Sequence, residues 1–137
     1  MRESTHVRWG WLRFMYIYTI VGAGGFGVGM LFIPAFIQSV FGFPAQDPVV
    51  FGITASVYTG FGLISLLGLK SPLKFAPLLL LQLCYKAIWL VVVIVPLLFS
   101  GRFPLYATTL LIIYVTYIIG DLIAIPFPYI FSKRTES

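Results

Sequence analysis

The chain has 137 residues, of which 60% are hydrophobic and 9% are charged, and its formal net charge is +5 at pH 7. Soluble domains carry roughly 25% charged residues, and a soluble domain of this length could not hide so much apolar surface. A helical bundle in lipid has no such need, because lipid tails are as apolar as leucine. The composition excludes a water-soluble domain and predicts a single membrane domain, residues 1–137, surrounded by the bilayer.

The distribution of the basic residues and the counts of cysteine and histidine exclude further classes. The nine lysines and arginines are dispersed between hydrophobic runs, whereas nucleic-acid-binding proteins gather them in a basic stripe, so we expect no nucleic-acid partner. Cys84 is the single cysteine and His6 the single histidine. Neither a disulfide, a Cys-x-x-Cys pair nor an intramembrane histidine cluster can be built from them, so no metal or cofactor is predicted.

Four apolar segments follow one another along the chain, at about residues 14–33, 49–69, 75–99 and 105–127. A helix needs about 20 apolar residues to cross the hydrocarbon core of a bilayer, and each segment approaches or exceeds that length. Proline, glycine and polar residues separate the segments. Because short connections make neighbouring helices antiparallel, the predicted fold is an all-α, up-down bundle of four transmembrane helices with a tail at 128–137.

Lysine and arginine are divided unevenly between the two ends of these helices. Seven lie beside the termini or in the second connection: Arg2, Arg8, Arg13, Lys70, Lys74, Lys133 and Arg134. The connection 34–48 has none, and the connection 100–104 has only Arg102. Basic residues stay on the cytoplasmic side, so we predict a multi-pass protein of the cell (inner) membrane with both termini cytoplasmic.

Two further features bear on the membrane boundaries. Aromatic residues near both termini suit belts at the cytoplasmic interface: Trp9, Trp11, Tyr16, Tyr18, Phe127 and Tyr129. The connection 34–48 is too apolar for a solvated turn and too short to span. We expect it to lie along the outer interface or to dip inward as a lid.

Residues 22–27 match the pattern G-x-G-x-x-G, and Asp47 follows twenty residues after Gly27. A dinucleotide site needs a strand–turn–helix setting, whereas these glycines lie at bilayer depth and Pro34 interrupts the helix. We interpret the small residues as positions where two helices approach closely: Ala23, Gly25, Gly27 and Gly29 on the first segment, and Gly52, Ser56 and Gly60 on the second. The two faces pack against each other within one molecule, or one of them forms a seam with a second copy; both alternatives stay open.

Two ionisable residues lie far from the segment ends: the base Lys86 and the acid Asp121. A charge at that depth costs at least about 2.5 kcal/mol. At about 1.5 Å per residue, Lys86 lies about 18 Å and Asp121 about 14 Å from the terminal side, and the long lysine stem covers the difference. The spacing predicts an intramembrane Lys86–Asp121 pair between the third and fourth helices.

Amide and aromatic side chains accompany the two charges at helical spacing: Gln82, Tyr85 and Trp89 on the third segment, Tyr114 and Tyr117 on the fourth. Together they predict an aromatic-lined polar pocket that opens toward the cytoplasm, which Thr54, Tyr58 and Ser65 of the second segment could complete. The alternative is ordinary core contact, with each tyrosine hydroxyl hydrogen-bonded and the charges serving only to fix helix register. Both alternatives stay open.

These observations support three hypotheses about function. The leading one is binding or transport of a small, anionic or amphiphilic ligand at Lys86, as a homo-oligomer, because four helices alone rarely enclose a pathway. The second is an accessory subunit of a larger membrane complex, in which the Lys86–Asp121 pair is structural. The third is an enzyme acting on a lipid or isoprenoid, although the sequence has no nucleophile, metal or cofactor signature to support it.

In size and four-helix plan the chain resembles the small multidrug exporters. Their hallmark is an acidic residue in the first membrane helix, where this chain has glycines. The resemblance is therefore architectural, and it assigns no role to any residue.

Overall fold

The computed structural model describes residues 7–132. The predicted topology signals Arg2, Lys133 and Arg134, and the histidine His6, lie outside the described residues. Over the described range the secondary structure is helical and includes no strand. Four helices are long and apolar enough to cross a membrane: Trp9–Phe32, Pro48–Lys70, Ala76–Ser100 and Leu105–Ala124. The four predicted segments are confirmed, and they fit a multi-pass membrane protein.

Two of the four long helices contain a π-helical turn. The first is built from α1 (Trp9–Thr19), the π turn η2 (Ile20–Gly24) and α2 (Gly25–Phe32), and the third from α5 (Ala76–Trp89), the π turn η3 (Leu90–Ile94) and α6 (Val95–Ser100). The second is α4 (Pro48–Lys70) and the fourth is α7 (Leu105–Ala124). Turns of this kind are rare and frequently occur at functional sites.

The ends of the first and fourth helices differ from the predicted bounds. The first begins at Trp9 rather than near residue 14, and it includes Arg13, whose guanidinium lies 5.6 Å from the centre of the Trp9 ring. The fourth ends at Ala124 rather than Phe127. Ile125 is extended there, because the following proline disfavours helical backbone, and a short helix α8 (Phe127–Phe131) comes after the break.

The connection between the first two long helices contains the helix α3 (Pro34–Phe41). Proline suits the first turn of a helix, and Gly42 ends α3 with a positive φ of 72°, which glycine adopts without strain. The helix folds back on its neighbours, since Ile37 contacts the buried cluster of Met30, Phe51 and Ala55. Its placement along the membrane interface or as a lid stays a prediction.

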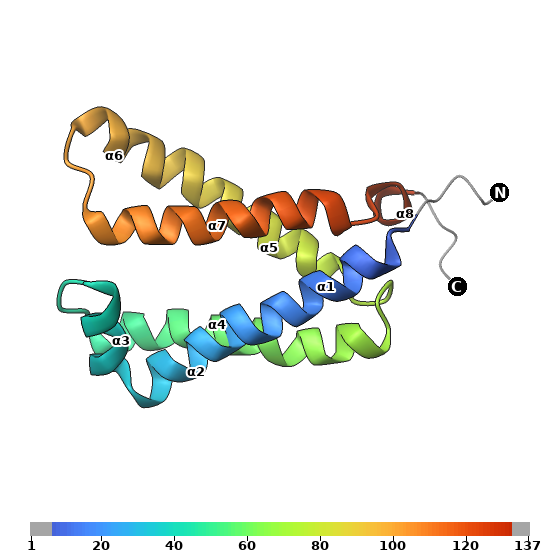
Figure 1. The fold of residues 1–137 in the computed structure, drawn as a ribbon, viewed down its shortest axis with the longest axis horizontal. Helices are drawn as coiled ribbons and strands as arrows, with labels where there is room; N and C mark the ends of the chain where they lie inside the picture. The colour runs from blue at the N-terminus through green and yellow to red at the C-terminus, as the bar shows by residue number, and fades with distance from the viewer. Residues whose placement is uncertain (1–6, 133–137) are drawn as a thin grey trace.

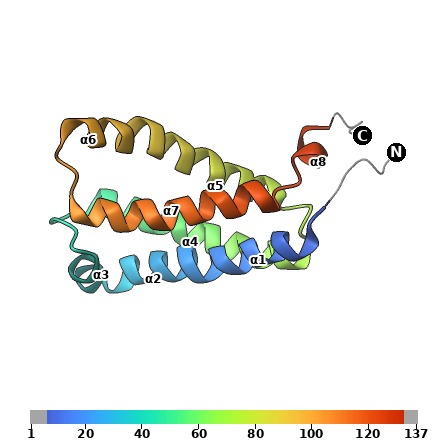
Figure 2. The ribbon, with the colours of Figure 1, turned by 45° about the horizontal axis from the view of Figure 1, so that its top comes forward.

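The long helices are arranged as two pairs (Figures 1 and 2). The segment α1–α2 lies against α4, α5 lies against α7, and α1 joins the pairs by contacting α7. We call the end where α1 begins and α8 lies the terminal end, and the opposite end the α3 end. In Figure 1 the pairs approach each other at the terminal end and diverge toward the α3 end.

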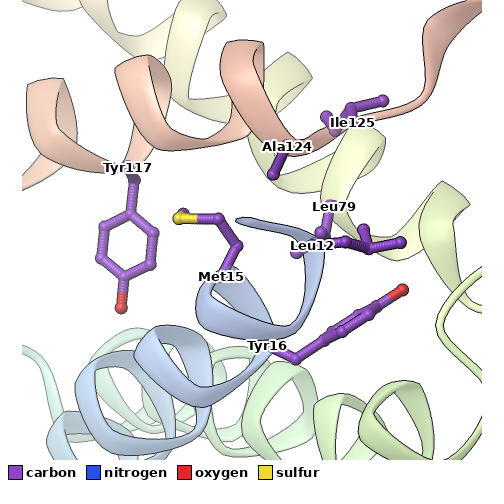
Figure 3. Close-up of a cluster of buried hydrophobic side chains, with 7 residues drawn as sticks. All are labelled: Leu12, Met15, Tyr16, Leu79, Tyr117, Ala124 and Ile125. Carbon is purple, nitrogen blue, oxygen red and sulfur yellow. The ribbon is translucent and has the colours of Figure 1, made fainter. Parts of the chain in front are cut away.

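A cluster of buried apolar side chains fills the terminal half of the molecule (Figure 3). Its members come from α1, α5, α7 and the residue after α7: Leu12, Met15, Tyr16, Leu79, Tyr117, Ala124 and Ile125. The outward faces carry exposed apolar side chains such as Phe32, Phe99 and Leu105. Such surfaces are expected of helices that face lipid, where no hydrophobic force drives them inward.

Candidate functional site

The amide and the two charged residues of the predicted site are buried inside the protein rather than facing lipid. Gln82 and Lys86 lie one turn apart on α5, and Asp121 lies on α7. Their exposed fractions are 0%, 1% and 0%. Polar and ionisable residues in membrane helices almost always face the bundle interior, and the burial of these side chains agrees with that expectation.

The Lys86 ammonium is enclosed by three tyrosines. Its Nζ donates a hydrogen bond of 2.7 Å to the Tyr85 hydroxyl. It also lies 4.4 Å, 4.5 Å and 4.4 Å from the ring centres of Tyr85, Tyr114 and Tyr117. A desolvated cation over an aromatic face gains about 2 kcal/mol or more. The aromatic residues of α5 and α7 therefore replace part of the hydration that the ammonium loses.

The Asp121 carboxylate has a different set of partners. Gln82 Nε2 donates to its two oxygens at 3.1 and 3.4 Å. Gln82 Nε2 also donates to Thr19 Oγ1 at 3.3 Å. The single hydroxyl hydrogen of Thr19 points to the Met15 carbonyl at 2.7 Å, while Gln82 Oε1 lies 3.4 Å from Thr19 Oγ1. This Thr19–Gln82–Asp121 network connects α1, α5 and α7 across the centre of the molecule.

The predicted direct pair between Lys86 and Asp121 is not formed in the described part of the chain. Gln82 takes the position beside the carboxylate, one turn before Lys86. The ammonium instead reaches the rings of Tyr114 and Tyr117, which precede Asp121 on α7. Both charges belong to one site, but each is held by neutral partners.

More aromatic residues surround the lysine from neighbouring helices. The Tyr58 hydroxyl of α4 is hydrogen-bonded to the Tyr114 hydroxyl of α7. The Trp89 ring lies 4.6 Å from the Tyr114 ring, and Phe61 of α4 lies 5.4 Å from Tyr85. The structure thus brings Gln82, Tyr85, Trp89, Tyr114 and Tyr117 together around the two charges. Of the second-segment candidates Tyr58 joins them, whereas Thr54 is exposed and Ser65 is buried without a hydrogen-bond partner.

Tyr16, Tyr18 and Thr19 were not among the predicted site residues. Tyr16 is fully buried and donates to the Pro72 carbonyl at 2.7 Å. The Tyr18 ring stacks on Tyr117 with 4.4 Å between centres. The full burial of Tyr16 contradicts its assignment to an interfacial belt, whereas the assignment of Tyr18 stays a prediction. Thr19 follows Tyr16 by three residues, a helical spacing that places these two side chains on one face, and that spacing was the available signal for an interior face.

A cavity of about 180 Å³ adjoins the lysine. Its walls come from α1, η2, α2, α3, α4, α5 and α7: Tyr18, Gly22, Ala23, Phe26, Phe41, Tyr58, Lys86, Leu110, Ile113, Tyr114 and Tyr117. Gly22 is required in this wall, because a Cβ there would collide with the Tyr117 hydroxyl. The lining is mostly apolar, and its side-chain polar groups are the lysine nitrogen and the tyrosine hydroxyls.

The cavity continues toward the α3 end of the molecule. A second hollow of about 240 Å³ shares Phe26, Tyr58 and Leu110 with it, and reaches Gln46 and Tyr106. On the opposite side the buried cluster of Figure 3 fills the space. The helix pairs are in close contact at the terminal end, and the hollow space lies toward the α3 end. The prediction that the pocket opens toward the cytoplasm stays a prediction.

The predicted close-contact residues divide into two groups. Gly27 faces α4, where an added Cβ would lie 2.6 Å from the Thr59 nitrogen, and Ala23 is buried. Gly29 faces Ile37 of α3, with 2.9 Å between an added Cβ and Cδ1. These positions let elements approach closely.

The remaining small residues do not make such contacts. An added Cβ at Gly25, Gly52 or Gly60 would meet no atom within 4 Å, and Ser56 is exposed. The prediction that these α4 residues pack against the first long helix within one molecule is therefore wrong. Gly62 takes that role instead, because a Cβ there would lie 2.5 Å from the Gly24 Cα. Only the outward-facing alternative remains open for Gly52, Ser56 and Gly60.

Metal-binding residues do not gather in the part of the chain that the structure describes. Residues 7–132 include no group of three or more histidine, cysteine, aspartate or glutamate side chains that could hold an ion. No match to the chain is found among protein-family models, curated proteins or solved structures. The functional argument therefore depends on the geometry around Lys86.

Proposed function

We propose that this chain is a multi-pass protein of the cell membrane that binds a small organic anion with an apolar body in the cavity beside Lys86. The proposed topology is an up-down bundle of four helices with both termini cytoplasmic. The arrangement of the helices in Figure 1 supports it, as does the concentration of lysine and arginine at the terminal end.

The observation that carries the proposal is the buried ammonium at the wall of the cavity. An ammonium has three donors and no acceptor, and Lys86 uses one of them on the Tyr85 hydroxyl. The cavity lining includes no carboxylate. Since a buried charge is normally paired, a carboxylate or phosphate brought by a ligand is the partner that the site lacks.

The rest of the lining sets the character of the ligand body. The rings of Tyr18, Phe26 and Phe41 and the side chains of Leu110 and Ile113 surround the space. Ligand sites of this kind are mostly apolar, with a few polar groups that fix orientation. We therefore assign a compact aromatic or aliphatic body to the anion.

Transport across the membrane is a further part of this proposal. The hollows give access from the α3 end, while the buried cluster closes the terminal end. Transport needs that cluster to open, and a homo-oligomer supplies additional walls for a pathway. The outward-facing small residues of α4 are the proposed seam, because small residues allow membrane helices to approach closely.

A binding measurement with a matched pair of lysine variants tests the proposal. Sodium benzoate serves as the anionic probe and benzyl alcohol as its neutral counterpart, with purified protein in a non-ionic detergent. Lys86→Met should abolish benzoate binding by calorimetry. Lys74→Met is the control, because Lys74 lies in the connection after α4 with its Nζ 5.8 Å from the Phe75 ring, and it should leave binding unchanged.

Two results would overturn the proposed function. One is that the wild-type protein does not bind benzoate and that no anion co-purifies with the protein in native mass spectrometry. The other is equal binding of benzoate by the wild type and Lys86→Met while both remain folded by circular dichroism. Stronger binding of benzyl alcohol than of benzoate would show that the lysine does not select a negative charge.

A second candidate function rests on the outward face of α4. Gly52, Ser56 and Gly60 leave a stripe of small residues open to the surroundings, as an accessory subunit would offer to a larger membrane complex. This alternative predicts that the double change Lys86→Met with Asp121→Leu is tolerated, because buried charges can often be replaced by apolar groups of similar volume. Full stability of the double variant and an empty cavity in wild-type protein would favour it.

A further inference from the structure

We infer that each anion bound beside Lys86 brings one proton, which Asp121 takes up. This inference rests on the proposed function and adds a coupling to it. The site would then be an anion–proton co-binding site, in which the carboxylate of Asp121 becomes a carboxylic acid when the ligand is present and is ionised when the ligand is absent.

The first argument is that the two charges have separate surroundings. The ammonium is held by Tyr85, Tyr114 and Tyr117, and the carboxylate is held by Gln82. A contact ion pair would have to be broken before Lys86 could bind another anion. Here the ammonium remains available at the cavity, while Asp121 balances its charge from a neighbouring position.

The second argument is charge balance in an apolar interior. With the cavity empty, Lys86 and Asp121 are both buried, and as an ammonium and a carboxylate their charges sum to zero. A monovalent anion at Lys86 changes that sum to one negative charge, and unbalanced charge is costly inside a membrane. A proton from water, added to one oxygen of Asp121, restores neutrality without moving either helix.

The third argument is the chemistry of the Asp121 partner. A lysine or arginine beside the carboxylate would only donate, and would therefore favour the ionised form. Gln82 has both an N–H donor and a carbonyl acceptor on one amide, and the Thr19 hydroxyl can also donate or accept. Rotation of the amide lets Gln82 accept a hydrogen bond from the protonated acid. The Thr19–Gln82–Asp121 network can thus serve both protonation states.

Other ionisable groups near Asp121 come from each helix packed against it. Tyr16 of α1, Tyr85 and Lys86 of α5, and Tyr117 of α7 interact with it electrostatically. Arg8 donates to the Ile123 carbonyl, two residues further along the chain. Asp47 is the other acid within residues 7–132, and it caps α4 at the α3 end by accepting from the Val50 nitrogen at 2.9 Å. Asp121 is therefore the carboxylate that can compensate an anion at Lys86.

Calorimetry in two buffers measures the coupling directly. Benzoate is titrated into the protein at one pH in Bis-Tris and in Tris, two cationic buffers whose ionisation enthalpies differ, so that the difference in heat gives the protons taken up. Wild-type protein should take up about one proton per benzoate, and its benzoate affinity should fall about tenfold for each unit rise in pH. Asp121→Asn should bind benzoate with no proton uptake and no pH dependence. Asp47→Asn is the matched control and should behave as wild type.

The outcomes separate this inference from the proposed function. Absence of benzoate binding in the wild type contradicts both. Binding without proton uptake in the wild type overturns the coupling and leaves the anion site intact. Uptake that persists in folded Asp121→Asn shows that the proton goes to another group, and also overturns the inference. If Asp121→Asn does not fold, the wild-type pH dependence decides by itself, because a pH-independent affinity rules the coupling out.

Discussion

The two ends of this molecule differ in how their helices meet. At the terminal end, α1, α5 and α7 share a continuous buried cluster. Toward the α3 end, two adjacent hollows with shared walls lie between α2, α4 and α7, and aromatic rings line them. The comparison indicates that the two halves have different roles: the terminal half holds the helix pairs together, and the α3 half leaves room for a ligand. Lys86 and Asp121 lie where the two halves join.

The largest expected effect comes from opening the terminal half. Leu79→Ala removes a fully buried side chain from the cluster of Figure 3 and should lower the free energy of unfolding by about 2–5 kcal/mol, because the cavity it leaves cannot fully collapse. Thermal or denaturant unfolding in detergent measures it. Leu81→Ala, on the exposed side of the same helix, should change stability far less. An equal loss of stability in both variants would contradict the role of the buried cluster in holding the helix pairs together.

A smaller loss should follow from separating η2 and α4. Gly62→Ala places a Cβ 2.5 Å from the Gly24 Cα, so the two backbones must move apart, at a cost of about 1–3 kcal/mol. Gly60→Ala is the matched control, because its added Cβ meets no atom within 4 Å. The same unfolding measurement applies, and a Gly62→Ala variant as stable as Gly60→Ala would show that the close contact is absent.

The smallest change in stability is expected at the α3 half. Tyr58→Phe removes the hydroxyl bond to Tyr114 that joins α4 to α7 across the hollows, and should lower stability by about 0.6 kcal/mol. Its effect on ligand access should be larger, since Tyr58 belongs to the walls of both hollows. Stopped-flow measurement of benzoate association should give a faster rate than in wild type. Tyr106→Phe is the control, because Tyr106 lines the second hollow but not the cavity beside Lys86. Equal rates in all three proteins would exclude a barrier at Tyr58.

The sequence predicted the features that depend on local composition. The four long helices follow from runs of apolar residues, and they were found with shifted ends. Lys86 and Asp121 stood out because charge is rare in such runs, and both are buried. Ile125 shows the limit even of a local signal, because Pro126 ended α7 earlier than hydropathy alone suggested.

Features that depend on how the helices meet were not predictable. Lys86 and Gln82 share one face of α5, and nothing in the sequence says which of them lies beside Asp121. The direction in which the cavity continues depends on the divergence of the two helix pairs, which no single segment encodes. The α4 glycines illustrate the same point, since Gly60 and Gly62 are two residues apart but only Gly62 meets η2.

The π turn η2 has a consequence for how a single membrane crossing divides its contacts. A π turn bonds each residue to the fifth along the chain instead of the fourth, so the residues beyond it are rotated relative to an uninterrupted α-helix. Before η2, α1 contacts both α4 and α7; after it, α2 contacts α4 and α3. Beyond the widened turn, the same membrane-crossing helix keeps its contact with α4 but turns away from α7. One flank of α7 is therefore left uncovered, and the cavity lies beside it.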